Sequence, residues 1–215
     1  MKETISTEDF IIILNDICKT IEDQKDYLSE LDRKIGDGDH GVTMNIGWMA
    51  VKEKLSTINP SDGFHKICTQ IASSFLSAVG ASAGPLYATA LMRGGGAVKD
   101  KNSLDAMSFS LFLNAAANGI KERGKAEIGD KTMLDVWIPA ADEMKKKASE
   151  GANLMEALEC TVNTAENAMN NTKNLLAKKG RSSKLGNRSI GHIDPGAASS
   201  FAIINSIFQT LKEMN

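Results

Sequence analysis

STEDFIIILNDICKTIEDQKDYLSEL, residues 6–31, is the stretch that decides the fold class of this chain. Its apolar side chains recur with the spacing of one face of an α-helix, and polar residues fill the opposite face. The apolar positions are Phe10, Leu14, Ile17, Ile21, Leu28 and Leu31. Ser6 or Thr7 stands where an N-cap would accept the first free N–H groups of that helix. The stretch therefore predicts a long amphipathic helix close to the N-terminus.

The same helical periodicity continues to the end of the chain, and no segment alternates convincingly as a half-buried strand would. Pro85 and Pro195 suit the first residue of a helix, and three glycines from Gly94 are expected to weaken or end the fourth helix. The seven further helices are expected over about 42–55, 64–79, 85–93, 104–122, 132–147, 154–177 and 195–211. Residues 178–194 show no helical pattern. We therefore expect an all-α fold of eight amphipathic helices, with residues 1–215 forming a single domain.

The composition fits a folded protein without a general affinity for nucleic acid. Hydrophobic residues make up 42% of the 215 residues and charged residues 24%, as in ordinary globular domains. The net charge of −2 lacks the positive excess that releases counterions from nucleic acid. The basic residues of the late stretch are Lys178, Lys179, Arg181, Lys184 and Arg188, with no stacking aromatics between them. Nucleic acid is therefore not expected as a partner.

The expected location is the cytoplasm. The first residues, MKETISTEDF, lack the basic and apolar regions of a signal peptide, and no apolar run has membrane-spanning length. Cys18, Cys68 and Cys160 lie far apart, without zinc-ligand spacing, and are expected to be reduced thiols of the core. No membrane association is expected.

Four of the expected helices begin beside glycine or small polar residues. These starts are HGVT at 40–43, GASAGP at 80–85, GDKT at 129–132 and DPGAA at 194–198. A bare helix N-terminus presents unpaired N–H groups and the positive end of the helix dipole, which suits phosphate. Glycine and proline are also common at helix ends for structural reasons. One such start indicates nothing, but four of them beside clustered aspartates favour an anion site.

The clustered aspartates lie in LDRKIGDGDHG, residues 31–41. One glycine separates Asp37 from Asp39, so a turn can direct both carboxylates to one point, and Asp32 is within reach if the loop folds back. Mutual repulsion would raise the pKa of these groups unless a cation relieved it, and oxygen ligands select magnesium, calcium or manganese over zinc. An Asp- and Gly-rich surface turn is the alternative. An EF-hand is excluded, because Trp48 stands where its bidentate glutamate is required.

His40 and Thr43 follow the cluster at the start of the second helix. His40 can donate a hydrogen bond to phosphate, carry a phosphoryl group or cap the helix, and phosphate contact is the favoured role. Thr43 can donate to phosphate or bond back into its own helix. Residues 124–132, GKAEIGDKT, approach the P-loop pattern, but the preceding segment is polar and helical instead of a buried strand, so a P-loop is rejected.

Four motifs in order carry a family resemblance: IGDGDHG, GASAGPLY, GDKTMLD and the late GRSS…GHIDPGA. They resemble the ADP-binding L subunits of phosphotransferase-system dihydroxyacetone kinases and the C-terminal nucleotide domain of ATP-dependent dihydroxyacetone kinases. The similarity runs from about Asp32 to Ala197. It implies a barrel of eight antiparallel amphipathic helices that binds its nucleotide at one end.

The resemblance also implies roles for individual residues. Asp32, Asp37 and Asp39 would hold two Mg²⁺ ions that bridge the phosphates of ADP or ATP. The phosphate site would comprise His40, Gly41, Val42, Thr43, Ser82 and Ala83, and relatives often carry another small or hydroxylated residue at the position of Ala83. The adenosine would lie between Gly124 and Met133. The late loop over the nucleotide would contribute Arg181, Asp194, Pro195 and Gly196. No catalytic nucleophile is implied on this chain.

In that family, ADP stays bound as a cofactor and a phosphohistidine protein of the phosphotransferase system recharges it to ATP. The γ-phosphoryl group then passes to dihydroxyacetone, which a histidine of a separate K subunit holds covalently. This chemistry requires the nucleotide subunit to position the γ-phosphoryl group and to stabilise its charge during transfer. Magnesium ions and helix N-termini can do both. The implied partners are the K subunit and the phosphohistidine donor, and the resemblance also allows contact with a transcription regulator.

Three other functions remain open on the residues alone. The substrate could be another small keto-sugar, because its pocket would lie on the partner. The chain could also be a binding module that senses nucleotide state and contacts a regulator. A magnesium-dependent phosphohydrolase is the third alternative, and retention of bound nucleotide would argue against it.

Overall fold

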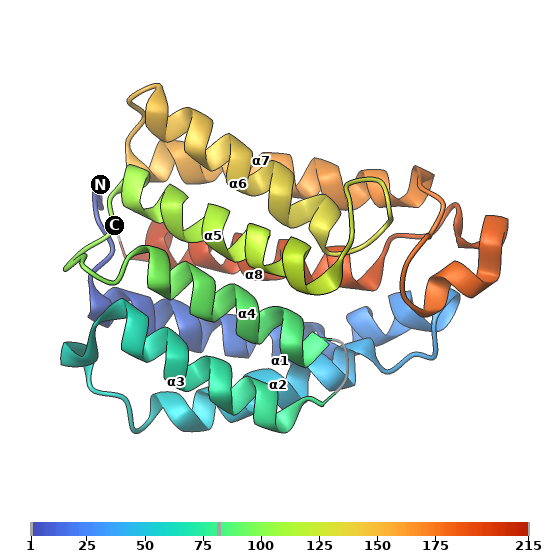
Figure 1. The fold of residues 1–215 in the computed structure, drawn as a ribbon, viewed down its shortest axis with the longest axis horizontal. Helices are drawn as coiled ribbons and strands as arrows, with labels where there is room; N and C mark the ends of the chain where they lie inside the picture. The colour runs from blue at the N-terminus through green and yellow to red at the C-terminus, as the bar shows by residue number, and fades with distance from the viewer. Residues whose placement is uncertain (1, 81–82, 215) are drawn as a thin grey trace.

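The computed structural model describes residues 2–80 and 83–214, and α-helices make up most of them (Figure 1). The eight α-helices are α1 (Thr7–Ile35), α2 (His40–Leu55), α3 (Gly63–Ala78), α4 (Ala83–Ala97), α5 (Ala106–Gly124), α6 (Leu134–Ser149), α7 (Leu154–Asn171) and α8 (Pro195–Glu213). Three short 3₁₀ helices accompany them: η1 (Pro60–Asp62), η2 (Thr172–Asn174) and η3 (Arg181–Ser189). The described residues form no strand, only one isolated bridge between Ile5 and Leu104.

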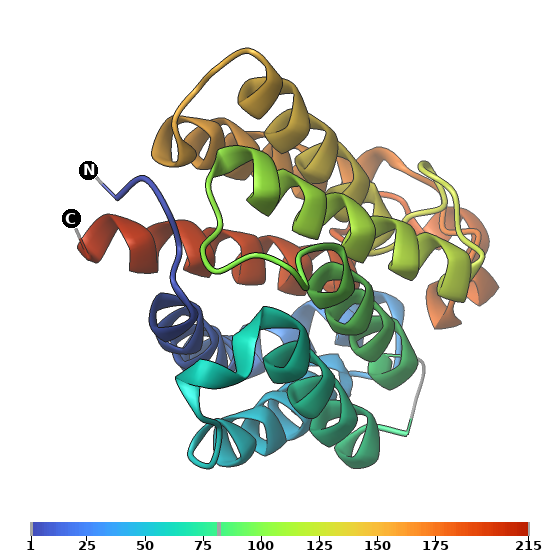
Figure 2. The same ribbon diagram turned by 60° about the vertical axis from the view of Figure 1, so that its left-hand side comes forward.

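The helices form a closed ring, since each packs on the next in sequence and α8 packs on α1 (Figures 1 and 2). Buried apolar side chains from the helices cluster in the interior of the ring. Phe10 of α1 meets Phe64 of α3 and Phe112 of α5 edge to face, with ring centroids 5.5 and 5.8 Å apart. Aromatic pairs in this geometry add to the stabilisation from burial of their area. The prediction of an all-α fold of eight antiparallel helices is confirmed.

The fourth helix differs from its prediction at both ends. It begins at Ala83, two residues before Pro85, and it continues through Gly94 and Gly95 to Ala97. These two glycines permit close packing, because a Cβ on Gly94 would lie 2.9 Å from the Phe112 ring and one on Gly95 would lie 2.5 Å from Cβ of Cys68. The glycines therefore let α5 and α3 approach α4 and do not break the helix.

The structure also corrects the end of the seventh helix and the description of residues 178–194, and it decides which residue caps the first helix. The seventh helix ends at Asn171 instead of Ala177, and the stretch expected to have no helical pattern contains η3. At the other end of the chain Ser6, not Thr7, caps α1. The Ser6 hydroxyl accepts the N–H of Asp9 at 3.2 Å, and the Asp9 carboxylate accepts the N–H of Ser6 at 2.9 Å, which completes a capping box.

The antiparallel order places the starts of α2, α4, α6 and α8 at one end of the bundle, on the right in Figure 1, with both chain termini at the other end. Motifs that are far apart in sequence therefore meet at this end, which we call the loop end. Among the described residues, no helix combines the length and the apolar character needed to cross a membrane.

Candidate functional site

Three carboxylates converge at the loop end. One oxygen from each of Asp32, Asp37 and Asp39 lies within 4.8 Å of the others. Asp32 is buried near the end of α1, whereas Asp37 and Asp39 lie exposed in the loop before α2. Hard, oxygen-only donors at this spacing suit Mg²⁺ or a similar cation.

The loop backbone fixes the carboxylate of Asp32. Its Oδ2 accepts the N–H groups of Asp39 at 2.9 Å and of His40 at 3.1 Å. Its Oδ1 lies against Gly36, where an added Cβ would stand only 2.0 Å away. A side chain at position 36 would therefore displace the Asp32 carboxylate from this position, and the loop folds back over Asp32, which is the arrangement that the sequence left open.

A cation from a distant segment reaches the same cluster. Arg181 of η3 forms an ion pair with Asp37 and lies 3.6 Å from Asp39. It is flanked by Lys179, Gly180 and Ser182, which line the hollow beside the carboxylates. The late segment therefore lies beside the carboxylates and lines the hollow.

Two adjoining hollows open at the loop end. The first, of about 230 Å³, is lined by the three carboxylates and by polar side chains from α2 and from the segments directly before α6 and α8. The second, of about 410 Å³, has mainly apolar walls, including Leu86, Ile120 and Met133. Leu86, Thr132, Met133, Lys179 and Gly180 line both hollows, so the two are continuous. A carboxylate-lined compartment beside an apolar one can hold, with a cation, a molecule that has an anionic end and a flat apolar end.

His40 lies at the first residue of α2 and lines the first hollow. Its Nε2 is 3.0 Å from the hydroxyl of Ser199 on α8. Burial lowers the pKa of His40 to about 4, and the negative charge of Asp32 opposes this shift only in part. The ring is therefore neutral near pH 7.

Lys131 joins the two loops that border the hollows. Its side chain is buried, and Nζ donates to the carbonyls of Ser189 at 2.5 Å, His192 at 2.7 Å and Leu175 at 3.2 Å. The backbone of Lys131 is left-handed, with φ of 62°, which is uncommon for a residue other than glycine. Lys131 thereby holds residues 175–192 against the start of α6 and keeps them over the site.

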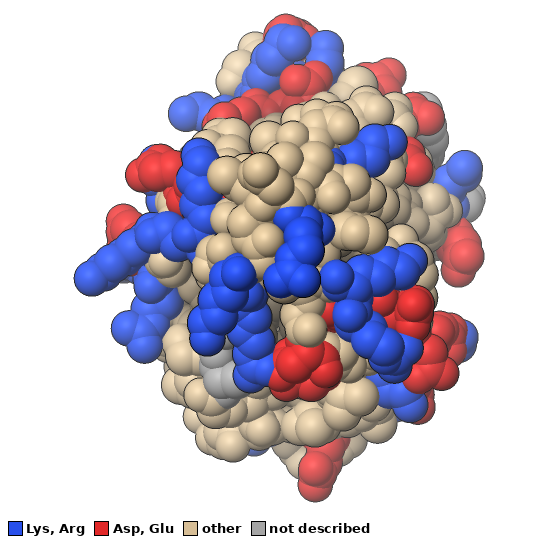
Figure 3. Space-filling model, turned by 90° about the vertical axis from the view of Figure 1, so that its right-hand side faces the viewer, with Lys and Arg blue, Asp and Glu red and all other residues tan. Residues whose placement is uncertain are grey.

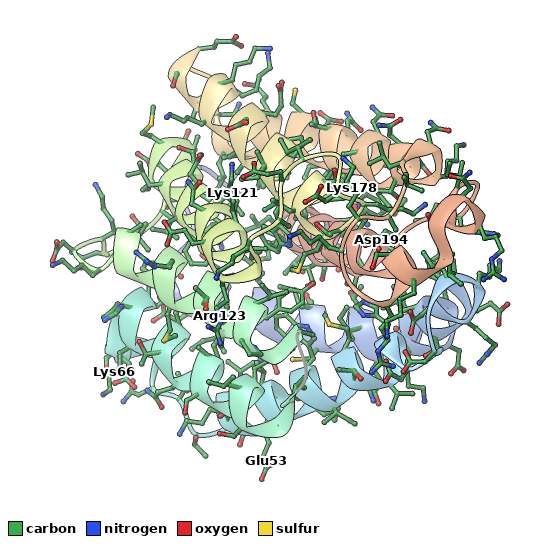
Figure 4. The ribbon with its side chains drawn as sticks, turned by 45° about the vertical axis from the view of Figure 1, so that its right-hand side comes forward. Glu53, Lys66, Lys121, Arg123, Lys178 and Asp194 are labelled. Atoms are coloured by element: carbon green, nitrogen blue, oxygen red, sulfur yellow. The ribbon has the colours of Figure 1, made fainter. Side chains whose placement is uncertain are left out.

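Asp194 caps α8 from inside the site. One carboxylate oxygen accepts the N–H of Ala197 at 2.8 Å, and the backbone N–H of Asp194 donates to the hydroxyl of Thr172 at 3.0 Å. Burial raises the pKa of Asp194 to about 7, although the helix cap and the charge of Lys131 lower it. Figure 4 shows Asp194 among the crowded loops, while Glu53 points outward from the bundle.

The structure brings most of the predicted site residues together. The first hollow is lined by Asp32, Asp37, Asp39, His40, Thr43, Ala83, Met133, Arg181, Asp194, Pro195 and Gly196. Gly124 lines the second hollow. Gly41 lines neither, because it packs against α1, where an added Cβ would lie 1.9 Å from the carbonyl oxygen of Lys25. Val42 lines neither and is exposed. Ser82 lies outside the described residues.

Sequence reasoning missed several residues of the site. Lys131 and Thr132 belong to the GDKT motif, from which only the following Met133 was selected. Lys179 was considered only among the basic residues of the late stretch, and Ser199 was not considered. The position of GDKT at a helix start, opposite DPGAA, was the available signal for the first two.

Charge at the loop end is predominantly positive at the surface. Figure 3 faces this end and shows lysine and arginine side chains around a smaller group of acidic ones. Arg123, Lys179, Lys184 and Arg188 are exposed and form no ion pair within the described part of the chain. Because the chain carries a net charge of −2, this positive face is a local feature.

Comparisons with known proteins identify relatives of this chain. The family described as the DAK2 domain matches residues 34–209. The chain is 40% identical over 191 residues to "PEP-dependent dihydroxyacetone kinase, ADP-binding subunit DhaL" of Escherichia coli (strain K12), covering 88% of this chain and 90% of that protein. It is 33% identical over 201 residues to "Triokinase/FMN cyclase" of Homo sapiens, covering 94% of this chain and 35% of that protein.

The fold also matches a solved structure. The native dihydroxyacetone kinase of C. freundii aligns with a TM-score of 0.72 and 22% identity, over 93% of this chain and 34% of that one. A second structure of that kinase, in complex with AMP-PNP and Mg²⁺, aligns with the same TM-score of 0.72.

Proposed function

This chain belongs to the DAK2-domain family, and on that premise we propose that it is the nucleotide-carrying subunit of a dihydroxyacetone kinase that works with separate partner proteins. The relatives that match along nearly their whole length are named as ADP-binding subunits of such kinases. The whole of residues 1–215 would act as one nucleotide-binding domain.

One observation carries this proposal: the carboxylate cluster and the starts of α2, α4, α6 and α8 face a single pair of connected hollows. The phosphates of ADP or ATP fit the first hollow, where carboxylate-bound cations and the helix N-termini would neutralise them. The adenosine fits the second, where Met133 and Leu86 offer apolar contact and Gly124 leaves room. A solved relative carries AMP-PNP and Mg²⁺, in keeping with this ligand pair.

The donor set of the cluster fits Mg²⁺, and we infer two ions. Asp32, Asp37 and Asp39 with the phosphates of ADP together carry more negative charge than one divalent ion neutralises. Bound Mg²⁺ would supply charge neutralisation to the phosphoryl group during transfer. The N–H groups of Asp39 and His40 would keep the Asp32 carboxylate in the orientation of a metal ligand. Arg181 would move from the carboxylates to a phosphate oxygen, where its planar guanidinium can donate two hydrogen bonds.

We propose two partner proteins for this chain, a K-type subunit and a phosphohistidine donor. Its hollows adjoin a positive face, and the substrate would be held on a K-type subunit that docks there. A phosphohistidine protein of the phosphotransferase system would recharge ADP at the same face. The smaller overlap with a triokinase extends the class of substrates to related small keto-sugars and trioses. Cys18, Cys68 and Cys160 are all free thiols, which is consistent with a reducing cytoplasm.

Mass spectrometry of the purified chain under native conditions tests the proposal directly. We expect retained ADP or ATP, together with Mg²⁺, and release of both after treatment with a chelator. Purified chain that neither retains nor binds these nucleotides in the presence of Mg²⁺ would refute the proposal. Net hydrolysis of ATP by the chain alone would favour a phosphohydrolase instead.

A further inference from the structure

Residues 173–193, which we call the basic segment, carry six lysine and arginine side chains and no carboxylate. Two of these cations have partners, since Lys178 lies 3.7 Å from a carboxylate oxygen of Asp130 and Arg181 pairs with Asp37. The other four are exposed and form no ion pair with the described residues: Lys173, Lys179, Lys184 and Arg188. On the helices, by contrast, most lysines and arginines pair with a carboxylate.

Three of these four cations lie outside the nucleotide hollows. Lys179 lines both hollows, whereas Lys173, Lys184 and Arg188 line neither. A nucleotide in the hollows would therefore not be a direct partner of these three. A surface that carries one sign of charge raises the local concentration of an oppositely charged partner and speeds their encounter. The three cations therefore suit an anionic partner that approaches from outside.

Hydrogen bonds hold the basic segment in place and join it to the loop before α6. The Ala177 N–H donates to Oγ of Ser189 at 3.0 Å. The Lys178 N–H donates to the carbonyl oxygen of Asp130 at 3.0 Å. Three stretches therefore lie side by side, at about residues 128–130, 176–178 and 189–190.

Each of these stretches contributes one exposed apolar side chain. Ile128 is 58% exposed, Leu176 39% and Ile190 46%. Single exposed apolar residues are ordinary, but three of them on joined loops beside unpaired cations have the composition of a protein interface, with apolar contact inside a charged rim. Figure 3 shows basic side chains on several sides of an uncharged area at this end. Nucleic acid or free phosphate would use only the cations, so the combination favours a protein as the partner.

The two partner proteins of the proposed function bring groups of different charge to the loop end. A K-type subunit brings dihydroxyacetone, which is neutral, whereas the donor brings a phosphohistidine, whose phosphoryl group is anionic. In the recharging step the P–N bond of the donor breaks and phosphorus bonds to a β-phosphate oxygen of ADP, while the freed histidine takes up one proton. Positive charge beside the hollows therefore favours the approach of the donor more than that of the K-type subunit.

We propose that the phosphohistidine donor docks on Ile128, Leu176 and Ile190 and on the cations beside them, and that it presents acidic residues to this surface. We call these three apolar residues, with Lys173, Lys184 and Arg188, the donor face. The existence of the donor rests on the proposed function, whereas the preference for an acidic protein surface rests on the charges and exposure of these residues. Opposite charges would steer the encounter, and apolar contact would hold the complex.

A double charge reversal, Lys184→Glu with Arg188→Glu, tests the electrostatic part. The probe is the fluorescently labelled phosphohistidine protein of the phosphotransferase system encoded in the same genome, and anisotropy measures its association with the nucleotide-free chain. The reversal should weaken this association at least about tenfold at low salt. The difference should shrink in 1 M salt, where the Debye length is about 3 Å. Lys99→Glu with Lys145→Glu makes the same change in charge on exposed residues away from the loop end and should bind the donor normally. Normal association of the Lys184/Arg188 variant at low salt would overturn the proposal.

The apolar part has its own variant. Ile128→Ser with Ile190→Ser should weaken association by about tenfold without changing its salt dependence, because it removes apolar contact and no charge. Leu111→Ser, on the exposed side of α5 and away from the loop end, should have no effect. Unchanged donor affinity in the Ile128/Ile190 variant would remove the apolar residues from the donor face and overturn the proposal as stated.

Separate assays of the two half-reactions distinguish the donor from other partners. The Lys184/Arg188 variant should slow the recharging of ADP by the donor. The same variant, preloaded with Mg-ATP, should pass its phosphoryl group to dihydroxyacetone on a K-type subunit at the wild-type rate. Equal slowing of both steps would assign the surface to the K-type subunit. Binding of the wild type, but not of this variant, to phosphatidylserine vesicles, together with normal donor affinity in both, would assign it to a membrane. Either result would overturn the proposal.

Titration with Mg-ADP separates this proposal from the proposed function. All these variants should bind Mg-ADP like the wild type, because none of the substituted residues lines either hollow. A wild type that binds no nucleotide would refute the proposed function, whereas the association assay on the nucleotide-free chain would still decide whether the donor face binds the donor protein.

Discussion

Gly36 and Asp32 fit together with no space for a side chain: a Cβ on Gly36 would lie 2.0 Å from Oδ1 of Asp32. The N–H of Gly36 also donates to the carbonyl oxygen of Asp32 at 2.5 Å, at the end of α1. The orientation of the buried carboxylate therefore depends on the absence of a side chain four residues later. This relationship links the backbone of the loop to the metal site that we propose.

Gly36→Ala should displace the Asp32 carboxylate and weaken Mg-ADP binding by at least about tenfold, as expected for a change that disturbs a metal ligand. Isothermal titration with Mg-ADP measures the effect. Gly96→Ala is the control, because no atom lies within 4 Å of a Cβ at that helical position. The control should bind normally and gain about 0.5–1 kcal/mol of stability from the better helix former. Normal binding by Gly36→Ala would separate Asp32 from the ligand site.

Asp37→Asn and Asp39→Asn should each reduce Mg-ADP affinity by about 10–100-fold, because each removes one anionic oxygen donor from the cluster. The helical signal in circular dichroism should remain, since both side chains are exposed in a loop. Asp26→Asn changes a more exposed carboxylate on α1, outside both hollows, and should have no effect. If either cluster variant retained ADP as the wild type does, the metal assignment would be wrong.

Lys131→Met should loosen residues 175–192 over the site. It leaves three carbonyls without the Nζ donor, at a cost of about 1–3 kcal/mol in the free energy of unfolding. Trypsin should cleave this variant faster at Lys184 and Arg188, and Mg-ADP should slow cleavage of the wild type there. Lys145→Met, on an exposed face of α6, is the control for loss of a lysine. Equal cleavage of the wild type with and without Mg-ADP would count against a cover that closes on nucleotide.

The raised pKa of Asp194 predicts that the stability of the nucleotide-free chain depends on pH. Its folded pKa is raised from the ordinary 3.8 to about 7, chiefly by burial. The charges of Asp135 and Asp32 contribute to this rise, whereas the hydrogen bond from the Ala197 N–H and the charge of Lys131 oppose it. The folded state then binds more protons than the unfolded state between about pH 4 and 7, so this group makes stability fall as pH rises through that window. Asp194→Asn keeps the helix cap and should flatten the slope in denaturant titrations. Asp142→Asn, with an exposed side chain, should retain it.

The sequence was sufficient for the architecture because helical periodicity is a local property. Phe10, Leu14 and Ile17 have the spacing of one helical face whatever they pack against, and all three are buried. Helix ends were less predictable. In the sequence, Gly94 and Gly95 are expected to end a helix, whereas in the structure they allow neighbouring helices to pack closely against it. Their effect depends on tertiary packing, which a single sequence does not display.

The candidate site likewise contains residues that the sequence indicates by their spacing and residues that it does not. Asp37 and Asp39 were found because one glycine separates them, and their position beside Asp32 agrees with the expectation of a folded loop. Lys131 could not be found by spacing, because its three carbonyl partners lie 44 to 61 residues away. The contact of Ser199 with His40 spans 159 residues. The long-range contacts that these residues make are visible only in the folded chain.

The last prediction is that this chain alone does not phosphorylate dihydroxyacetone. Covalent capture of a small ketone needs an activated nitrogen nucleophile, and the described residues of the site offer none. Burial lowers the pKa of Lys131, but its Nζ is surrounded by three carbonyl oxygens that hold it in place. His65 is exposed on α3, away from both hollows, and His40 is bonded to Ser199.

A three-carbon substrate also has too little surface to be oriented against a phosphoryl group without an enclosing pocket. Both hollows at the loop end are occupied in our proposal by the nucleotide, so the pocket must come from a K-type subunit. The purified chain, mixed with Mg-ATP and dihydroxyacetone, should form no dihydroxyacetone phosphate above the uncatalysed background. Addition of a K-type subunit should start turnover, and Asp37→Asn should abolish it in that mixture. Repeated turnover by the chain alone would show that it is a self-contained kinase whose substrate site lies elsewhere in this fold.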